Sequence, residues 1–378
     1  MKKISLFLIS IFCICLISAC SSKEDSIEIQ NTQINDFSEK NTENKSIDDK
    51  ISYVDLEYDE INKNLTLLDL GLNQVLQEVP VESTETIDAY QKIKDGYAIV
   101  KSTFEEDVDN AKQVNGIIIS KGSSDYKTSY EFISYDEKLQ EKNVIDLKSM
   151  ISEELMTEIQ ESQPEPKIDP LGHHIAWSTI NGIYVLNVES GEQKVHEIEE
   201  DGFSGYEIAF IDENKVGFYQ QKGETTVTTR YGYWDLSTDQ IVYEEEDDYS
   251  PSQIRVSGEC LVLNDSEDPA THSSSGKVVI YDCQKNQSNV FLVDNTESTF
   301  ATVTSDGAYL IVYVCLDNEL MKHRVRIYQL SSKECVNEIP FSTEKGVRFY
   351  DFCNSENDYL LIGNGDAGKV VYHVFAAK

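Results

Sequence analysis

The sequence predicts an all-β fold: a six-bladed β-propeller of four-stranded antiparallel blades, with seven blades as the alternative. A turn followed by an apolar strand recurs, and its markers Gly96, Gly172, Lys215, Gly258, Gly307 and Asp358 stand 76, 43, 43, 49 and 51 residues apart, so that four of the five intervals agree. A second hairpin with a polar turn follows these units, which makes four strands per unit. A period in the forties with four strands per unit is typical of propeller blades.

The first twenty residues have the layout of a secretory signal. A short basic front, Lys2-Lys3, precedes an apolar run from Ile4 to Ile17, and small residues then lead to Cys20. The apolar run is about 14 residues, shorter than the roughly 20 that a helix needs to cross a bilayer. We therefore expect residues 1–19 to be a signal peptide.

The tetrapeptide Ile17-Ser18-Ala19-Cys20 resembles the bacterial lipobox, in which cleavage falls before the cysteine and the cysteine receives a lipid. The resemblance implies that Cys20 is the first mature residue and that its thiol carries a diacylglycerol. Buried acyl methylenes contribute about 0.8 kcal/mol each, so such a chain is held at a membrane without spanning it. We expect an extracytoplasmic protein anchored by its lipid to the cell membrane.

Residues 20–50 are expected to be the lipidated cysteine followed by a disordered tether. Sparse Ile and Phe side chains among Ser, Asn, Asp, Glu and Lys cannot offset the entropy of an ordered chain. Residues 51–378 are expected to form the propeller. Within them, residues 149–166 carry Ile151, Leu155 and Ile159 at four-residue spacing. Ser152 can cap a helix there and Pro164 and Pro166 stop the run, which predicts one short helix inserted between the first two blades.

The two ends of the predicted propeller complement each other. Residues 64–79 look like a second hairpin with only residues 51–58 before it, and the last unit, from Val347, runs out before a fourth strand. Pairing of N-terminal with C-terminal strands closes the ring and leaves no open edge. Residues 51–81 and 347–378 are enough for one blade and too few for two, which favours six blades.

Residues 169–193 and 304–314 resemble the propeller repeats of TolB and the WD-repeat proteins, and the resemblance extends over residues 51–378. The Trp-Asp pair at 234–235 is similar to that of WD repeats, although no Gly-His pair precedes it at the expected place. The resemblance implies a bacterial lipoprotein whose propeller binds a protein, a peptide or an envelope glycan, because such propellers more often bind than catalyse.

Charge excludes one class of partner. The chain has 68 acidic and 32 basic side chains and a formal charge of −36. A field of this sign repels nucleic acid and anionic lipid faces, so no nucleic-acid partner is expected. A cationic partner, a cation-rich cell wall or solubility alone would each suit this charge, and solubility is the favoured explanation.

The cysteines beyond Cys20 form neither a full disulfide framework nor a zinc cluster. They are odd in number, no Cys-x-x-Cys pair occurs, and most lie in apolar runs, which indicates buried thiols. They are Cys260, Cys283, Cys315, Cys335 and Cys353. One disulfide, between Cys260 and Cys283, is left open.

No catalytic motif is complete. Residues 363–370, GNGDAGKV, resemble a phosphate loop, but Val370 stands where Ser or Thr binds magnesium and a strand follows, so a hairpin loop is favoured. Ser204 lacks the glycine spacing of a nucleophile elbow. His173 and His174 are adjacent, so in a strand they point to opposite faces and cannot grip one metal. We therefore assign no catalytic residue.

Three acidic clusters are candidate calcium loops: residues 105–110, 244–248 and 264–268. Calcium needs six to eight oxygen ligands, and none of the clusters has EF-hand spacing. Solvated loop charge is favoured, calcium is the open alternative, and no cofactor is expected. The longer loops near 103–128 and 264–276 are where a binding surface is expected.

The innermost strands of the blades are expected to line a central channel. On the repeat alignment, four polar residues of these strands are candidates for a ligand site: Asp88, Arg255, Arg348 and Asp351. The other interpretation places them at strand ends, where they hold neighbouring blades together.

Two classes of function follow. A non-catalytic binding module is favoured by the lipobox, the tether, the repeat and the lack of a nucleophile with a base. The alternative is an extracytoplasmic hydrolase or lyase that uses carboxylates at the channel mouth as acid and base. A weaker third hypothesis is an accessory scaffold beside a membrane complex.

Overall fold

A computed structural model describes most of the chain between Val54 and Ala376. The described residues are 54–60, 62–69, 74–105, 111–114, 117–120, 126–197, 202–203, 205–223, 227–265, 276–292, 298–304, 307–317, 322–342, 347–353, 359–366 and 369–376. The expected signal peptide, Cys20 and the tether lie outside them. Within these ranges, no helix has both the length and the apolar character to cross a membrane.

The described chain is almost wholly β-strand, with one α-helix and one 3-10 turn. The elements are β1 (Val54–Asp59), β2 (Asn64–Asp69), β3 (Gln74–Pro80), β4 (Glu85–Ile93), β5 (Gly96–Glu105), β6 (Ala111–Val114), β7 (Ile117–Ser120), β8 (Tyr126–Tyr135), β9 (Glu141–Asp146), η2 (Leu147–Ser149), α1 (Glu153–Ser162), β10 (Lys167–Ile168), β11 (His174–Ser178), β12 (Gly182–Asn187), β13 (Gln193–Glu197), β14 (Glu207–Asp212), β15 (Lys215–Lys222), β16 (Thr228–Asp235), β17 (Gln240–Asp247), β18 (Pro251–Ser257), β19 (Cys260–Asp265), β20 (Lys277–Asp282), β21 (Gln287–Leu292), β22 (Ser298–Val303), β23 (Tyr309–Asp317), β24 (Lys322–Gln329), β25 (Cys335–Ser342), β26 (Val347–Cys353), β27 (Tyr359–Asp366) and β28 (Lys369–Ala376).

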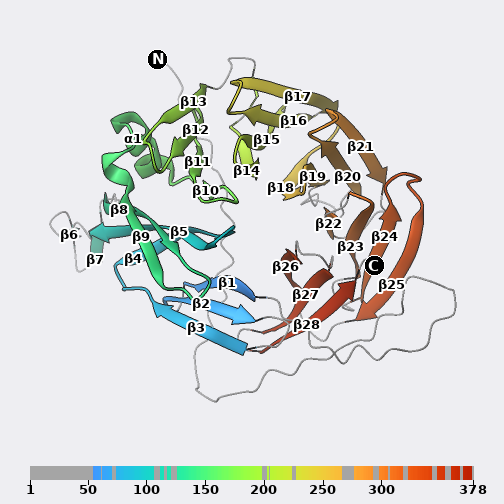
Figure 1. The fold of residues 1–378 in the computed structure, drawn as a ribbon, viewed down its shortest axis with the longest axis horizontal. Helices are drawn as coiled ribbons and strands as arrows, with labels where there is room; N and C mark the ends of the chain where they lie inside the picture. Colours follow the sequence, from blue (N-terminus) through green and yellow to red (C-terminus); the bar gives the residue numbers. More distant parts are fainter. Residues whose placement is uncertain are drawn as a thin grey trace.

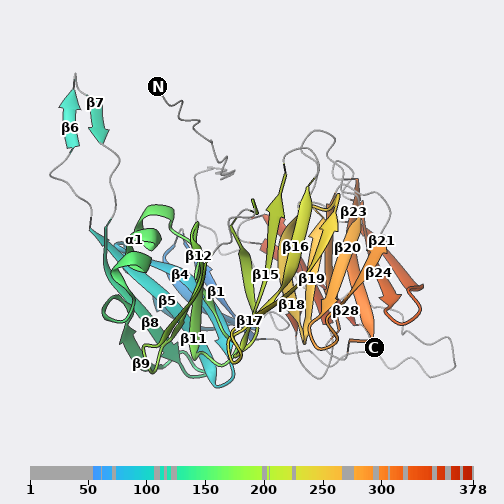
Figure 2. The same ribbon diagram turned by 90° about the horizontal axis from the view of Figure 1, so that it is seen from above.

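The predicted propeller of four-stranded antiparallel blades is confirmed. In chain order, sheet 1 is β1-β2-β3, sheet 2 is β4-β5-β8-β9, sheet 3 is β10 to β13, sheet 4 is β14 to β17, sheet 5 is β18 to β21, sheet 6 is β22 to β25 and sheet 7 is β26-β27-β28. These sheets stand around a common axis (Figure 1), and β6 and β7 form a separate two-stranded ribbon that projects from sheet 2 (Figure 2).

The two ends of the chain form separate three-stranded sheets. Sheets 2 to 6 have four strands each, whereas sheets 1 and 7 have three, and no pairing of strands joins sheet 1 to sheet 7 among the described residues. Counted together, as the sequence predicts, the two ends complete six blades; counted singly, they make seven. The predicted closure by terminal strands is therefore not among the pairings that the structure describes.

The first strands of the complete sheets lie toward the axis (Figure 1), and the contacts between their ends given below indicate that neighbouring first strands run in the same direction. We call the face that carries the turns between first and second strands the turn face, and the opposite face the loop face. Three contacts join neighbouring turns on the turn face: the Lys94 N–H donates to Pro170 O at 3.0 Å, Lys215 Nζ lies 3.6 Å from Glu259 Oε2, and Ser257 Oγ donates to Val303 O.

One glycine of the repeat is required by its close surroundings. Gly96 begins β5 with φ 138°, and a Cβ there would lie 2.1 Å from the Tyr135 carbonyl oxygen. A side chain is therefore excluded both by the backbone conformation and by the neighbouring strand.

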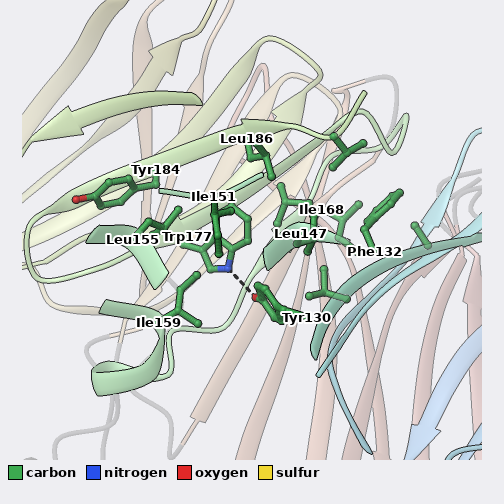
Figure 3. Packing of buried hydrophobic residues seen from close by; sticks show 14 residues of the cluster. Tyr130, Phe132, Leu147, Ile151, Leu155, Ile159, Ile168, Trp177, Tyr184 and Leu186 are labelled. Atoms are coloured by element: carbon green, nitrogen blue, oxygen red, sulfur yellow. Dashed lines mark hydrogen bonds between the residues drawn. The ribbon is translucent and has the colours of Figure 1, made fainter. Parts of the chain in front are cut away.

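Helix α1 confirms the predicted inserted helix. Ser152 caps it, because its Oγ accepts a hydrogen bond from the Leu155 N–H at 3.3 Å, and two acidic residues follow in the first turn. Leu155 and Ile159 form its buried face and pack with Tyr130 and Trp177 between sheets 2 and 3 (Figure 3). Because propeller blades diverge away from the axis, the helix fills a gap that strands leave open.

The core is divided among the spaces between neighbouring sheets. Side chains of a strand alternate between its two faces. In β15, Val216 and Phe218 pack against sheet 3, whereas Tyr219 packs with Leu261 and Tyr281 of sheet 5. Each sheet therefore depends on both neighbours for the burial of its apolar side chains.

Candidate functional site

All four predicted site residues lie on first strands, as the sequence indicated. Asp88 is in β4, Arg255 in β18, and Arg348 and Asp351 in β26. The side chains of the last two are outside the described part of the structure, so only their place on the innermost strand is given.

Asp88 lies at a bulge of β4, between Ile87 and Ala89. Burial raises the pKa of the Tyr130 phenol above its usual range, and the charge of Asp88 raises that pKa further. The Asp88 carboxylate therefore lies close enough to act on Tyr130, which packs between sheets 2 and 3.

Arg255 is a half-buried cation on β18. Burial lowers the pKa of its guanidinium to about 10, so the group stays charged at neutral pH. Its Nη2 lies 3.5 Å from Gln253 Oε1 on the same strand. The guanidinium thus keeps its charge in a costly environment on an inner strand.

A group of ionisable side chains connects the inner strands of sheets 1 to 4. We call it the axial cluster, and its members are Asp55, Glu57, Tyr90, Lys92, Glu165, Lys167 and Glu207. Tyr90 of β4 connects β1 with the chain before β10: burial and then the charges of Glu57 and Asp55 raise the pKa of its phenol, with a further contribution from Glu165. Tyr90 is also 45% exposed, so this member of the cluster is accessible to solvent.

Two carboxyl groups of the axial cluster have raised pKa values. Burial raises the pKa of Asp55, although the Leu56 N–H at 2.8 Å and the charge of Lys92 lower it in part. The pKa of Glu207 is also raised, by partial desolvation of a side chain that remains exposed, and Lys167 acts in the opposite direction. The carboxylates are therefore incompletely neutralised, and a further cation nearby stabilises their charged forms.

The sequence did not identify the axial cluster. Tyr90 and Glu207 lie on strands that the repeat alignment predicts to be innermost. The alignment does not distinguish these two residues from the other polar residues of the same strands. Asp55 and Lys167 carried no such signal, because β1 and the two-residue β10 were not recognised as inner strands.

The histidine pair forms part of a turn. Asp169 is fully buried, and its carboxylate accepts hydrogen bonds from the backbone N–H groups of Leu171, Gly172, His173 and His174. It also lies 3.0 Å from His174 Nδ1. Burial alone raises the pKa of Asp169, but the hydrogen bonds from His174 and the backbone outweigh it, so this pKa lies below its usual range. The prediction that these histidines are not catalytic agrees with this arrangement.

The sequence predicts that the acidic cluster at 244–248 is a loop, and this is wrong. Its first four residues lie in the strand β17. Glu245 Oε1 lies 2.9 Å from Arg230 Nη2, and Glu246 pairs with Lys277. Arg230 is held between the rings of Phe203 and Tyr243. In the described residues, no three His, Cys, Asp or Glu side chains are placed to hold a metal ion. Residues 106–110 and 266–268 of the other clusters lie outside the description.

The other motifs have structural roles or fall outside the described residues. The glycine-rich stretch 363–370 joins β27 to β28, with Asp366 paired to Lys369, which confirms a hairpin. Ser204 is outside the description. The predicted long loop near 103–128 contains the β6–β7 ribbon.

Cys260 and Cys283 are both free thiols. Cys260 packs with the cluster between sheets 5 and 6, whereas Cys283 packs with the cluster between sheets 4 and 5. The two thiols therefore lie on opposite faces of sheet 5, and the disulfide that the sequence left open does not form in this arrangement.

No protein-family model and no curated protein matches this chain. Several solved propeller structures are similar to it. The β-propeller domain of the Trilobed protease from Pyrococcus furiosus has 14% identity and a TM-score of 0.46, with 78% of this chain and 82% of that chain covered. Kluyveromyces lactis Hsv2 has 9% identity and a TM-score of 0.43, with 84% and 92% covered. The C-terminal WD40 domain of Sif2 has 12% identity and a TM-score of 0.42, with 82% and 79% covered. At these TM-scores the likenesses carry no argument about function.

Proposed function

We propose that this chain is a lipid-anchored, extracytoplasmic propeller that binds a protein or peptide partner without catalysing a reaction. The partner places a cationic side chain at the axial cluster. The observation that carries the proposal is the grouping of carboxyl groups around a half-exposed Tyr90: the charges of Glu57, Asp55 and Glu165 act on its phenol, and Glu165 also acts on Glu207. The raised pKa of Asp55 and of Glu207 supports it.

Several interactions favour a lysine or arginine side chain of the partner at the axial cluster. A cation restores the charged forms of the two carboxyl groups, and the face of the Tyr90 ring attracts a cation. The formal charge of −36 steers cationic partners toward the molecule and repels anionic ones. The inner strands hold the cluster on a rigid scaffold, which limits the ordering cost of binding.

A hydrolase that uses these carboxylates receives less support. Acid–base catalysis by a carboxyl pair needs environments that push the two pKa values apart, so that one group is an acid and the other a base. Desolvation shifts the pKa of both Asp55 and Glu207 upward. A glycan partner lacks the cation that the cluster favours, and it is therefore an outcome of the test below.

The partner is sought by crosslinking and pull-down from envelope extract with the full chain carrying Cys20→Ala, which is not lipidated. We expect a protein whose recovery falls at least tenfold with Tyr90→Ala or with Asp55→Asn combined with Glu207→Gln. Tyr243→Ala is the matched control, because Tyr243 is similarly exposed but lies on the outer strand β17. Equal recovery with all variants, recovery of glycan alone, or turnover of a peptide or glycan substrate contradicts the proposal.

The lipid anchor is tested separately. Labelled fatty acid should be incorporated into the unsubstituted chain, and Cys20→Ala should abolish both the label and recovery in the membrane fraction. Labelling that survives Cys20→Ala contradicts the assignment of Cys20.

A further inference from the structure

The β6–β7 ribbon is set apart from the sheets of the propeller. Among the described strands, β6 (Ala111–Val114) pairs with β7 (Ile117–Ser120) and with no other, so the two make a sheet of their own. Figure 2 shows the ribbon beyond the ends of β5 and β8, the strands of sheet 2 that precede and follow it in the chain. A two-stranded ribbon by itself is at best marginally stable in water. A contact outside the propeller therefore stabilises it.

One face of the ribbon is rich in apolar residues. The register places Val114 opposite Ile117 and Lys112 opposite Ile119. Residues two apart in a strand belong to the same face, and so do residues directly opposite each other. These four residues therefore share a face, and Ile118 belongs to the other. The three isoleucines are consecutive, and such a run on a projecting strand is expected only where it has a function.

The ribbon lies on the loop face of the propeller. It stands between β5 and β8, the second and third strands of sheet 2, and the links between second and third strands are on that face. Ile180, in the link between β11 and β12, is 75% exposed, and Leu292, where the fourth strand β21 ends, is 76% exposed. Single exposed apolar residues are common, but both of these lie on the face that carries the ribbon. The loop face therefore combines an apolar ribbon with two strongly exposed apolar side chains.

The ribbon differs from the rest of the chain in charge. The chain has a formal charge of −36. β6 and β7 have the sequences AKQV and IIIS, with one lysine and no acidic residue. At physiological salt the field of exposed charges is screened over about 8 Å. A ribbon that projects from the body therefore meets a lipid surface while the acidic propeller stays away from it.

We propose that the β6–β7 ribbon docks on a lipid bilayer, with Val114, Ile117, Ile118 and Ile119 at the boundary between headgroups and acyl chains. The inference rests on the proposed function in one respect, which is that the chain acts at a membrane. Apolar residues of a peripheral element are stabilised at this boundary, and a lysine beside them favours headgroup phosphates. The open edges of a two-stranded ribbon need hydrogen-bond partners that acyl chains lack, so the ribbon enters the boundary without crossing the bilayer.

Docking orients the anchored propeller. If residues 20–50 form the flexible tether that the sequence predicts, the anchor alone leaves the propeller free to rotate. Contact through the ribbon adds a second point of attachment and turns the loop face toward the bilayer. The anchor raises the local concentration of the ribbon at the surface, so that even a weak contact is occupied. The turn face then remains in water.

The test holds the protein on vesicles without using its own lipid. Residues 20–378 with Cys20→Ala and an N-terminal histidine tag are bound to phosphatidylcholine vesicles that contain a nickel-chelating lipid. The tag replaces the acyl anchor and supplies the same high local concentration. Brominated acyl chains in these vesicles quench the fluorescence of an indole that contacts them.

A tryptophan in the ribbon reports the contact. The two native tryptophans, Trp177 and Trp234, are fully buried, so a tryptophan added at the surface is the exposed one. Ile118→Trp should be quenched at least about twofold more than Val336→Trp. Val336 is the matched control, because it is an exposed apolar residue near the start of the outer strand β25, at the turn face.

Two further substitutions separate insertion from mere closeness to the surface. Ile117→Asp combined with Ile119→Asp, in the chain with Ile118→Trp, should reduce the quenching to that of Val336→Trp, because carboxylates disfavour the apolar boundary. Equal Tm values of the variants check that the propeller is intact.

Equal quenching of Ile118→Trp and Val336→Trp overturns the proposal, and this is the result expected if the ribbon instead enters a pocket of a protein. Quenching that survives the two aspartates overturns it as well. No lipid on Cys20 and no protein partner takes part in the measurement. Failure of the ribbon contact is therefore distinguishable from failure of the proposed function, which the labelling and pull-down experiments test.

Discussion

The Trp177 indole N–H donates a hydrogen bond to the Tyr130 phenol oxygen across 2.9 Å, between two side chains that are both 0% exposed (Figure 3). The bond joins the third strand of sheet 2 to the second strand of sheet 3. Helix α1 lies over the same cluster and keeps water from it. The two polar groups are thus hydrogen-bonded to each other inside the apolar cluster between sheets 2 and 3. Because the bond forms only when the two strands are correctly placed, it favours one arrangement of the two sheets.

Tyr130→Phe should lower the free energy of unfolding by about 2 kcal/mol, because the buried Trp177 N–H loses its acceptor. Urea denaturation followed by tryptophan fluorescence measures this loss. Tyr243→Phe is the control, since Tyr243 is exposed and its ring contact with Arg230 survives the change. Equal stability of Tyr130→Phe and the parent would show that water replaces the lost acceptor.

Leu155→Ala in α1 should lower the free energy of unfolding by about 3 kcal/mol, because the side chain is fully buried and its removal leaves a cavity. Glu161→Ala, on the exposed side of the same helix, should change it by less than about 0.5 kcal/mol. A small effect of Leu155→Ala would mean that the helix is not part of the cooperative core.

Asp169→Asn should be less stable than the parent by about 2 kcal/mol at pH 7, because the charged acceptor of a buried turn is lost. The folded-state pKa of Asp169 is lowered, so its contribution is complete above the unfolded pKa of about 3.9 and disappears as the pH falls through the folded value. The difference between the two proteins should therefore shrink below about pH 4. Denaturation curves at several pH values measure it, and a difference that does not depend on pH contradicts the role of the charge.

Asp55→Asn should have the opposite effect, since burial raises the folded-state pKa of Asp55. The folded protein then binds this proton more tightly than the unfolded chain, and stability falls as the pH rises through the two values. The variant should be more stable than the parent at pH 7 and equal to it at pH 3. If Asp55→Asn also fails to bind the proposed partner, the Asp55 carboxylate contributes to binding although it lowers the stability of the folded protein.

The thiols should alkylate in the order Cys335, Cys260, Cys283 at pH 8. Cys335 is exposed, whereas burial raises the pKa of Cys260 to about 11 and that of Cys283 to about 12. Few thiolates are then present at the two buried sites, so each should react at least about tenfold more slowly than Cys335. Mass spectrometry after timed iodoacetamide treatment gives the rates, and equal rates in guanidinium are the control. Fast reaction of Cys283 would contradict its burial.

The sequence predicts those features of the fold that depend on residues close together in the chain, and it misses those that depend on residues far apart. The repeat of turns and strands, the helix after Ser152 and the hairpin at 363–370 are set by neighbours in the chain, and the structure confirms them. The prediction of a solvated loop at 244–248 is wrong, because the partners of these carboxylates, Arg230 and Lys277, are distant in sequence. A cross-strand partner that neutralises a carboxylate leaves no local signal.

The candidate site shows the same limit. Asp88 and Arg255 were placed on inner strands by the period of the repeat alone, and that placement is confirmed. Which inner-strand side chains meet was decided by tertiary structure, because Asp55, Tyr90 and Glu207 come from three sheets. Their pKa values depend on burial, which no spacing along the chain encodes.

By itself the sequence determined the period, the alternation of strand and turn, and the acidic balance, since these follow from backbone geometry and composition. Only the tertiary structure decided that the two ends form separate three-stranded sheets, that Cys260 and Cys283 lie on opposite faces of sheet 5, and which side chains make up the axial cluster. The physical reason is that each of these features depends on contacts between residues far apart in the chain, which no local pattern determines.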